Sequence, residues 1–265
     1  MSTPSIPAPA VTPVPAATIV LMRDTGSGLE VLLVRRSPRA GFVPGAFVFP
    51  GGLVDPGDAA PEAIARFQGL SPERAAARLG LLGEDPPAIA YYVTAVREAF
   101  EETGILVSSQ GESPSGRTPA VPSYEVRADL LDRRISFAVA LERLGCRIAA
   151  DEIAYFAHWI TPERAPRRYD TRFFAARVTG EAEPDLDDRE MTEALWITPS
   201  EAVAVHSRGS LPMILPTIRT LERMAAYPDT GSALAALASA PVSTILPVPG
   251  AGGFAGPLAE ARLPG

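Results

Sequence analysis

The sequence predicts an α/β fold in which one chain supplies a mixed sheet and the helices that cover it. Segments rich in β-branched and aromatic residues alternate with segments of helical character, and this alternation is typical of α/β domains. The first two apolar segments flank a turn at 24–28 and predict a hairpin. The expected strands are 18–23, 30–36, 47–49, 153–160, 172–178 and 195–198.

Helices are expected between and after these strands. Two short helices at 61–68 and 71–79 each begin near a Pro or a Ser cap. A long helix starts at Pro86 or Pro87 and ends before Gly104, which suits a helix C-terminus. Further helices are expected at 136–144, from Pro199, at 215–226 and at 232–239, and a polar loop is expected at 110–122.

The chain of 265 residues is predicted to form one enlarged domain at 16–240. Hydrophobic residues make up 46% and charged residues 21%, enough to bury one core. Residues 1–15 are expected to be a disordered Pro-rich arm, and 241–265 a Pro/Gly-rich tail. Because neither end shows a targeting signal, the sequence favours a cytoplasmic location.

Composition excludes several classes of function. All 24 basic residues are Arg, which excludes Schiff-base chemistry and the Walker A phosphate loop, both of which need Lys. The net charge of −7 argues against nonspecific nucleic-acid binding. No apolar segment is long enough to span a membrane, and Cys146, the single cysteine, excludes an internal disulfide. Neither a nucleic-acid partner nor a membrane is therefore expected.

Three carboxylates gather on one face of the long predicted helix. Glu98, Glu101 and Glu102 stand at positions i, i+3 and i+4, so their side chains converge. Because like charges this close repel each other, the cluster needs a cation, and oxygen ligands of this kind suit Mg²⁺ or Mn²⁺. The alternative is a solvated Glu-rich helix face, which the glutamates alone do not exclude.

The surroundings of the cluster favour the metal site. Phe49-Pro50-Gly51-Gly52 lies upstream, Arg97 precedes the first glutamate, and Gly104 with the apolar residues after it ends the helix. Together these residues resemble the Nudix box, in which a glycine, five residues, an acid and seven residues precede Arg-Glu-apolar-x-Glu-Glu-x-Gly-apolar. Here Asp58 stands where the family has Glu, and the 38 residues 59–96 replace the seven-residue spacer.

The insertion within the box, together with 91–96 and 169–174, resembles the branch of Nudix hydrolases that includes the acyl-CoA diphosphatases. The resemblance implies an α/β/α sandwich with a mixed sheet, a helical insertion and extra C-terminal helices. The apolar residues of the insertion are expected to form a small satellite core, the alternative being a channel for an acyl or pantetheine group. They are Ile64, Phe67, Leu70, Leu79, Leu81 and Leu82.

The same resemblance implies a metal-dependent diphosphatase. The expected substrate is CoA or acyl-CoA, cleaved to 3′,5′-ADP and (acyl-)phosphopantetheine. ADP-ribose, NADH and oxidised nucleoside triphosphates are alternative substrates, since each presents a pyrophosphate. A non-catalytic, nucleotide-binding regulator is the alternative from another class. Because many family members are dimers, a homodimer is also expected from the resemblance.

The resemblance also assigns roles to individual residues. The expected metal ligands are Glu98, Glu101, Glu102 and the main-chain carbonyl of Gly51. Arg97 is expected to keep the glutamates oriented through ion pairs, and Asp58 is expected to orient Arg97.

Two further groups of residues are candidates. Glu190 is the first choice for the general base and Glu193 the second, with an ordinary solvated acidic loop as the alternative. Residues 32–37, Gly45 and 49–52 resemble the spacing of a signature in another CoA-cleaving Nudix group, except that Val34 stands where it has Thr and Gly41 where it has Arg. Arg39 lies two residues from Gly41, and Arg35, Arg36 and Arg39 thus lie near the predicted metal site. They are expected to hold substrate phosphates, for which the guanidinium is well shaped; arginines that only solvate a strand end are the alternative.

Overall fold

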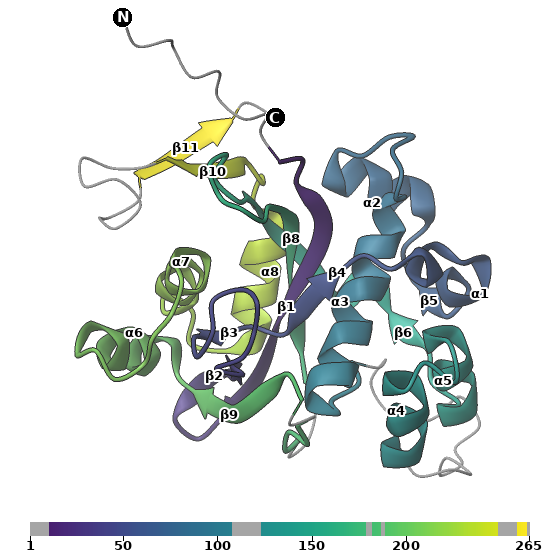
Figure 1. Cartoon of the computed structure of the whole chain (residues 1–265), viewed down its shortest axis with the longest axis horizontal. Helices are drawn as coiled ribbons and strands as arrows, with labels where there is room; N and C mark the ends of the chain where they lie inside the picture. The colour runs from purple at the N-terminus through teal and green to yellow at the C-terminus, as the bar shows by residue number, and fades with distance from the viewer. Residues whose placement is uncertain (1–10, 108–122, 179–181, 187–188, 249–258, 264–265) are drawn as a thin grey trace, which may run out of the picture.

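The computed structural model describes residues 11–107, 123–178, 182–186, 189–248 and 259–263, and these form a mixed sheet between helices (Figure 1). The strand order is β11-β10-β7-β8-β1-β2-β3, with β4 pairing to β1 and β9 to β2. β1 runs parallel to β8, and β10 runs parallel to β7. The other neighbours are antiparallel. The predicted α/β class and mixed sheet are therefore confirmed.

The strands of this sheet are β1 (Val14–Thr25), β2 (Gly28–Arg36), β3 (Phe47–Val48), β4 (Gly51–Leu53), β7 (Ala154–Ile160), β8 (Tyr169–Arg177), β9 (Met191–Ile197), β10 (Thr244–Val248) and β11 (Ala259–Leu263). A separate parallel pair joins β5 (Phe67–Gln68) to β6 (Ile148–Ala149). The helices are η1 (Pro56–Ala59), α1 (Pro61–Ile64), α2 (Pro72–Leu79), α3 (Ala88–Thr103), α4 (Ser123–Leu131), α5 (Phe137–Leu144), η2 (Ala150–Glu152), α6 (Pro199–Ser207), α7 (Leu215–Met224) and α8 (Thr230–Ser239). Within the described residues, no helix is long and apolar enough to cross a membrane.

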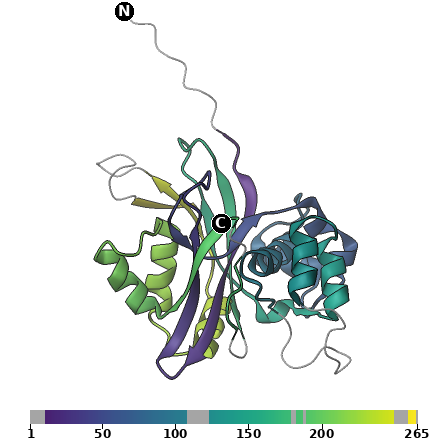
Figure 2. The ribbon, with the colours of Figure 1, turned by 60° about the horizontal axis from the view of Figure 1, so that its bottom comes forward.

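The sheet separates two hydrophobic cores, one under each layer of helices (Figure 2). Because successive side chains of a strand point to opposite faces, β1 supplies both cores. Ile19 and Leu21 pack on the α3 side, whereas Val20 and Met22 pack on the side of α6, α7 and α8. This arrangement is the predicted α/β/α sandwich.

α3 is the most buried helix of the site. Of its 16 residues, 14 are buried, and the two others are Glu98 and Glu101. A helix that is apolar on most sides is stable only inside a protein, and here the sheet, α2 and α4 surround it. Gly104 ends it in the left-handed conformation, with φ of 71°, and its N–H donates to the carbonyl of Phe100.

The insertion 59–96 forms part of the core beside α3. Its last nine residues are the first turns of α3, and its earlier helices α1 and α2 pack against that helix. Five of the six apolar residues named above pack in this core, whereas Leu82 is 75% exposed. None of the six lines the cleft described below. The structure thus does not support the channel, and it corrects the predicted small satellite core, because these residues belong to the main core on the α3 side of the sheet.

Four local features differ from the prediction. The helix expected at 61–68 ends at Ile64, because Phe67 pairs with the distant Ile148 in β5 and β6. The arm expected to be disordered over 1–15 stops before Val14, because β1 begins at that residue. The expected tail contains β10 and β11, and α4 was not predicted at all. Residues 1–10 and the whole predicted loop 110–122 lie outside the described residues.

Candidate metal centre

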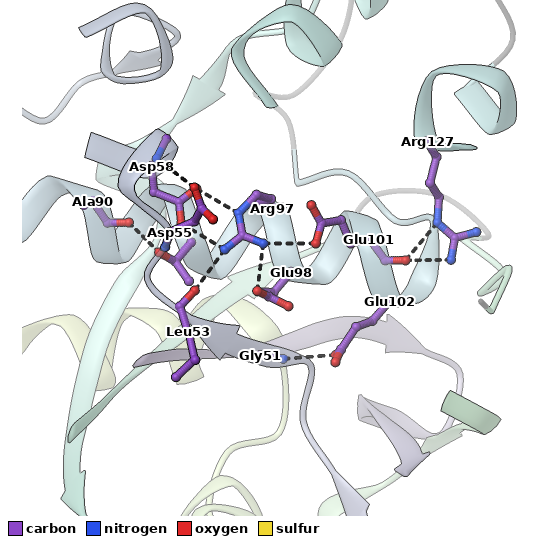
Figure 3. Close-up of polar contacts among 12 residues, drawn as sticks. Gly51, Leu53, Asp55, Asp58, Ala90, Arg97, Glu98, Glu101, Glu102 and Arg127 are labelled. Atoms are coloured by element: carbon purple, nitrogen blue, oxygen red, sulfur yellow. Dashed lines mark hydrogen bonds and ion pairs between the residues drawn. The ribbon is translucent and has the colours of Figure 1, made fainter. Parts of the chain in front are cut away.

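Arg97 is a buried guanidinium whose N–H groups are all used (Figure 3). Its Nε and Nη2 donate to the two carboxylate oxygens of Asp58 at 2.8 and 2.9 Å, and Nη2 also donates to the carbonyl of Leu53 at 3.0 Å. Its Nη1 donates to Glu98 at 2.7 Å and to Glu101 at 3.0 Å. The planar group therefore fixes both glutamates relative to the chain upstream of the insertion.

Asp58 meets Arg97 across the insertion, as predicted from the box pattern. Its side chain is 1% exposed. Besides the two bonds from Arg97, Oδ2 accepts from the Thr94 hydroxyl at 2.8 Å and from the Asp55 N–H at 3.0 Å. The bond from Asp55 belongs to the capping box of η1, so this 3₁₀ turn sets the position of the acid.

Gly51 and Gly52 let the chain pass close to the glutamates. The Gly51 N–H donates to Glu102 at 3.1 Å. A Cβ at Gly52 would lie 2.4 Å from the carboxylate carbon of Glu98, and one at Gly51 would lie 2.4 Å from the carbonyl oxygen of Ala17. Any larger residue would therefore displace either β1 or the carboxylates.

The glutamates carry more charge than the protein compensates. Burial raises the pKa of Glu101 to about 7 and raises the pKa of Glu102 well above its ordinary value. Burial also raises the pKa of Glu98, while Arg97 acts in the opposite direction. Asp58, Glu98 and Glu101 share the guanidinium of Arg97, while the charged form of Glu102 is favoured by the Gly51 N–H and by the charge of Arg36. A divalent cation would remove this excess of negative charge.

The donor set fits Mg²⁺ or Mn²⁺, because it consists of carboxylate oxygens beside a main-chain turn. Among the residues that the structure describes, no three Asp, Glu, His or Cys side chains are already closed around one point. Glu98 and Glu101 face Arg97, and Glu102 faces Gly51. The three glutamates are the residues that would hold a cation.

Arg127 of α4 fixes the C-terminal end of α3. Its Nε and Nη2 donate to the carbonyl of Glu101 at 3.0 and 2.8 Å, and its Nη1 pairs with Asp185 at 3.2 Å. The positive charge of the Arg127 guanidinium offsets the partial negative charge at the C-terminus of α3. Without it, this partial charge would disfavour the ionised form of the nearby glutamates. Arg127 was not predicted from the sequence, because α4 was not predicted.

A cleft of about 1110 Å³ opens in front of the glutamates. Its apolar walls come from the segment between β2 and β3, from α4 and α5, from β7 and β8, and from the start of α7. They include Phe42, Leu130, Phe137, Trp159, Tyr169 and Leu215. Four arginines also line it: Arg36, Arg97, Arg133 and Arg189.

The three arginines expected to hold phosphates have different surroundings. Arg36 lines the cleft, and its Nε donates to the carbonyl of Phe42 at 3.1 Å. Arg35 pairs instead with Glu193 on the neighbouring strand at 3.3 Å. Neither Arg35 nor Arg39 is among the residues that line the cleft.

The two candidates for the general base also differ. Glu190 lines the cleft, and its negative charge helps to raise the pKa of both Glu98 and Glu102. Glu193 lies on β9 and faces Arg35 outside the cleft. The geometry therefore favours Glu190 over Glu193.

The fold and the site together define a Nudix hydrolase domain: a mixed sheet between two helical layers, with an Arg-Glu helix facing two glycines. The family model described as the NUDT19 Nudix domain matches residues 7–224, and the chain belongs to this family. The resemblance stated from the box residues is thus confirmed.

Relatives and a solved structure are similar over most of the chain. A Caenorhabditis elegans protein named as a nudix hydrolase is 32% identical over 214 residues, which are 81% of this chain and 61% of that protein. The acyl-coenzyme A diphosphatase NUDT19 of Gallus gallus is 32% identical over 208 residues, 66% of this chain and 55% of that protein. A crystal structure of a NUDIX hydrolase from Alicyclobacillus acidocaldarius is 31% identical with a TM-score of 0.70, covering 87% of this chain and 99% of the other. The chain thus spans 55% to 61% of the length of these two curated relatives.

Proposed function

We propose that this chain is a metal-dependent diphosphatase that hydrolyses the pyrophosphate bond of CoA or acyl-CoA. The products would be 3′,5′-ADP and phosphopantetheine or its acyl derivative. The observation that carries the proposal is the buried cluster of Arg97 with Glu98, Glu101 and Glu102 at the wall of a large cleft. The similarity to the acyl-coenzyme A diphosphatase NUDT19 supports the choice of substrate.

The residues of the cluster suit hydrolysis of an anionic bridge. A pyrophosphate repels an attacking water, and a bound Mg²⁺ or Mn²⁺ would neutralise that charge. Glu98, Glu101 and Glu102 would hold the cation, and Arg97 keeps two of them in place. We assign acceptance of the proton from the attacking water to Glu190, which lines the same cleft.

The cleft also suits the two halves of a CoA molecule. Its aromatic and aliphatic walls offer apolar surface to an adenine ring and to a pantetheine arm. Trp159 and Tyr169 lie on one wall, and Leu130 and Phe137 belong to α4 and α5. ADP-ribose, NADH and oxidised nucleoside triphosphates share the pyrophosphate but lack the pantetheine arm.

Product analysis tests the proposal. Purified protein is incubated with CoA, acetyl-CoA, ADP-ribose, NADH and an oxidised nucleoside triphosphate, with Mg²⁺ or Mn²⁺, and the products are separated by chromatography. Release of 3′,5′-ADP from CoA at a kcat/KM at least tenfold above that for ADP-ribose supports the proposal, and the reverse order contradicts it. Binding of CoA without any product would indicate a nucleotide-binding regulator.

Two further properties, a homodimer and a cytoplasmic location, stay predictions. A homodimer is tested by light scattering on the purified chain at several concentrations. A cytoplasmic location is tested by fractionation of the cells that produce the protein.

A further inference from the structure

We infer that Arg133 binds a phosphate group of the substrate other than the pyrophosphate bridge. CoA carries such a group, the 3′-phosphate of its ribose. The inference rests on the proposed function of the same cleft. Arg133 lies in the turn between α4 and α5 and lines the cleft together with the glutamates of α3.

The backbone at Arg133 ends α4: the Arg133 N–H donates to the carbonyl of Leu130, and the Arg134 N–H donates to that of Asp129. The φ of Arg133 is 56°, in the left-handed region, where a residue with a Cβ costs about 1 kcal/mol. Within the described chain, Arg133 and Val43 are the non-glycine residues with positive φ, and both line the cleft. Glycine would adopt this conformation freely. The left-handed conformation thus belongs to an ordinary helix end, and the backbone does not require an arginine side chain at this position.

The acids near Arg133 are paired with other arginines. Asp132 pairs with Arg134 and lies 3.6 Å from Arg189, and Asp129 lies 3.3 Å from Arg134. In the part of the chain that the structure describes, the side chain of Arg133 forms no ion pair or hydrogen bond. Its charge is therefore uncompensated at the edge of the cleft.

The other arginines of the cleft each have at least one partner, whereas Arg133 has none among the described residues. Arg97 uses all its N–H groups within the metal cluster, Arg36 donates to a loop carbonyl, and Arg189 pairs with Asp132. Arg133 thus keeps its whole guanidinium for a ligand. The N-terminal end of α5 lines the same cleft, and its partial positive charge favours an anion of the same kind.

The geometry of the ligand follows from the guanidinium. Its planar fork bonds two oxygens of a phosphate at once, and a charged hydrogen bond of this type is about twice as strong as a neutral one. The pyrophosphate is assigned to the metal cluster, where the carboxylates lie. A CoA-type substrate carries one more anionic group, a terminal phosphate, and we assign this phosphate to Arg133.

The experiment compares CoA with dephospho-CoA, which lacks only the 3′-phosphate. In Arg133→Gln, the KM for CoA should rise about tenfold with kcat within about twofold, while the kinetics with dephospho-CoA stay unchanged. Arg134→Gln is the matched control, because Arg134 is paired with Asp132 and Asp129 and does not line the cleft. An equal rise of KM for both substrates, or no rise for either, overturns the inference.

Arg133→Gly separates binding from folding. Because glycine relieves the left-handed strain, the Tm should stay equal or rise, while the KM for CoA rises as it does in Arg133→Gln. A loss of folding stability together with normal discrimination between the two substrates would show that Arg133 is structural, and would overturn the inference.

A binding experiment that needs no hydrolysis tests the role of Arg133 independently of the proposed diphosphatase activity. Calorimetry on the wild-type chain compares 3′,5′-ADP with AMP, which differ in the 3′-phosphate alone. 3′,5′-ADP should bind about tenfold more tightly, and Arg133→Gln should remove the difference. This result would stand even if the chain cleaved no CoA. Equal binding of the two nucleotides by the wild type would overturn it.

Discussion

Arg97 on α3 and Arg35 at the end of β2 are the same residue type in opposite surroundings. The side chain of Arg97 is 11% exposed and bonds three carboxylates and a carbonyl, whereas that of Arg35 is 43% exposed and pairs with Glu193 at 3.3 Å. Exposed ion pairs contribute about 0–1 kcal/mol. Breaking a buried one costs several times more, about 3–5 kcal/mol. Burial and partners, and not the pattern of arginines in the sequence, thus separate the two roles.

The largest effect is expected at the acids that Arg97 supports. Glu102→Gln should lower kcat by about 10³-fold, because it removes a charge that a cation needs while preserving shape. The Tm without metal should stay equal or rise, since the buried charge costs stability. Turnover of CoA and thermal unfolding measure the two effects. Retention of more than a tenth of the activity would show that the cluster is not the metal site.

A substitution at Arg97 tests whether its planar fork matters. Arg97→Lys keeps the charge but cannot serve Asp58, Glu98 and Glu101 together. We expect a loss of about 10²-fold in kcat and about 3 kcal/mol in the free energy of unfolding. Urea denaturation and initial rates measure both. Arg35→Lys is the control. It should change kcat by less than about twofold and the free energy of unfolding by less than about 0.5 kcal/mol.

Arg127 should have an intermediate effect. Arg127→Gln removes the guanidinium that donates to the Glu101 carbonyl, so the last turn of α3, which carries Glu101 and Glu102, should become less rigid. We expect about a tenfold increase in the Mn²⁺ concentration for half-maximal activity. Asp185→Asn should change it far less, because the Asp185 side chain is 73% exposed. Equal effects of the two variants would contradict an action through α3.

The smallest effects are expected at Arg36 and Arg39, which follow Arg35 in the chain. Arg36→Gln should raise the KM for CoA about threefold, since Arg36 lines the cleft while Arg39 does not. Arg39→Gln should leave the KM unchanged within error. Steady-state kinetics on the two variants decide the matter. A larger effect at Arg39 would restore the sequence-based expectation that all three arginines bind phosphate.

The part of the site that is local in sequence could be predicted. Glu98, Glu101 and Glu102 share a helix face by geometry alone, and the box pattern also placed Asp58 against Arg97. The contacts of Arg97 with Asp58, Glu98 and Glu101 could therefore be expected from the sequence, whereas the metal-binding role of the glutamates stays a prediction. The burial of the glutamates could not be expected, because it depends on what packs around α3.

The rest depends on contacts between distant segments. Arg127 reaches α3 from a helix whose sequence shows little apolar periodicity. β10 begins at Thr244 in a Pro-rich segment, where its parallel pairing to His158 on β7 overrides the local preference for irregular structure. A single sequence contains no signal for which distant segments meet.

The insertion has a consequence for the continuity of the chain. Asp58 and Arg97 are 39 residues apart, and closing this longer loop costs about 1.4 kcal/mol more than closing the family's short spacer. Phe67 and Leu79 lie buried beside α3, so the two sides of the loop are held by packing and not by the connecting backbone. The chain could therefore be cut beside the exposed Leu82, and two separately produced fragments should still assemble the same centre.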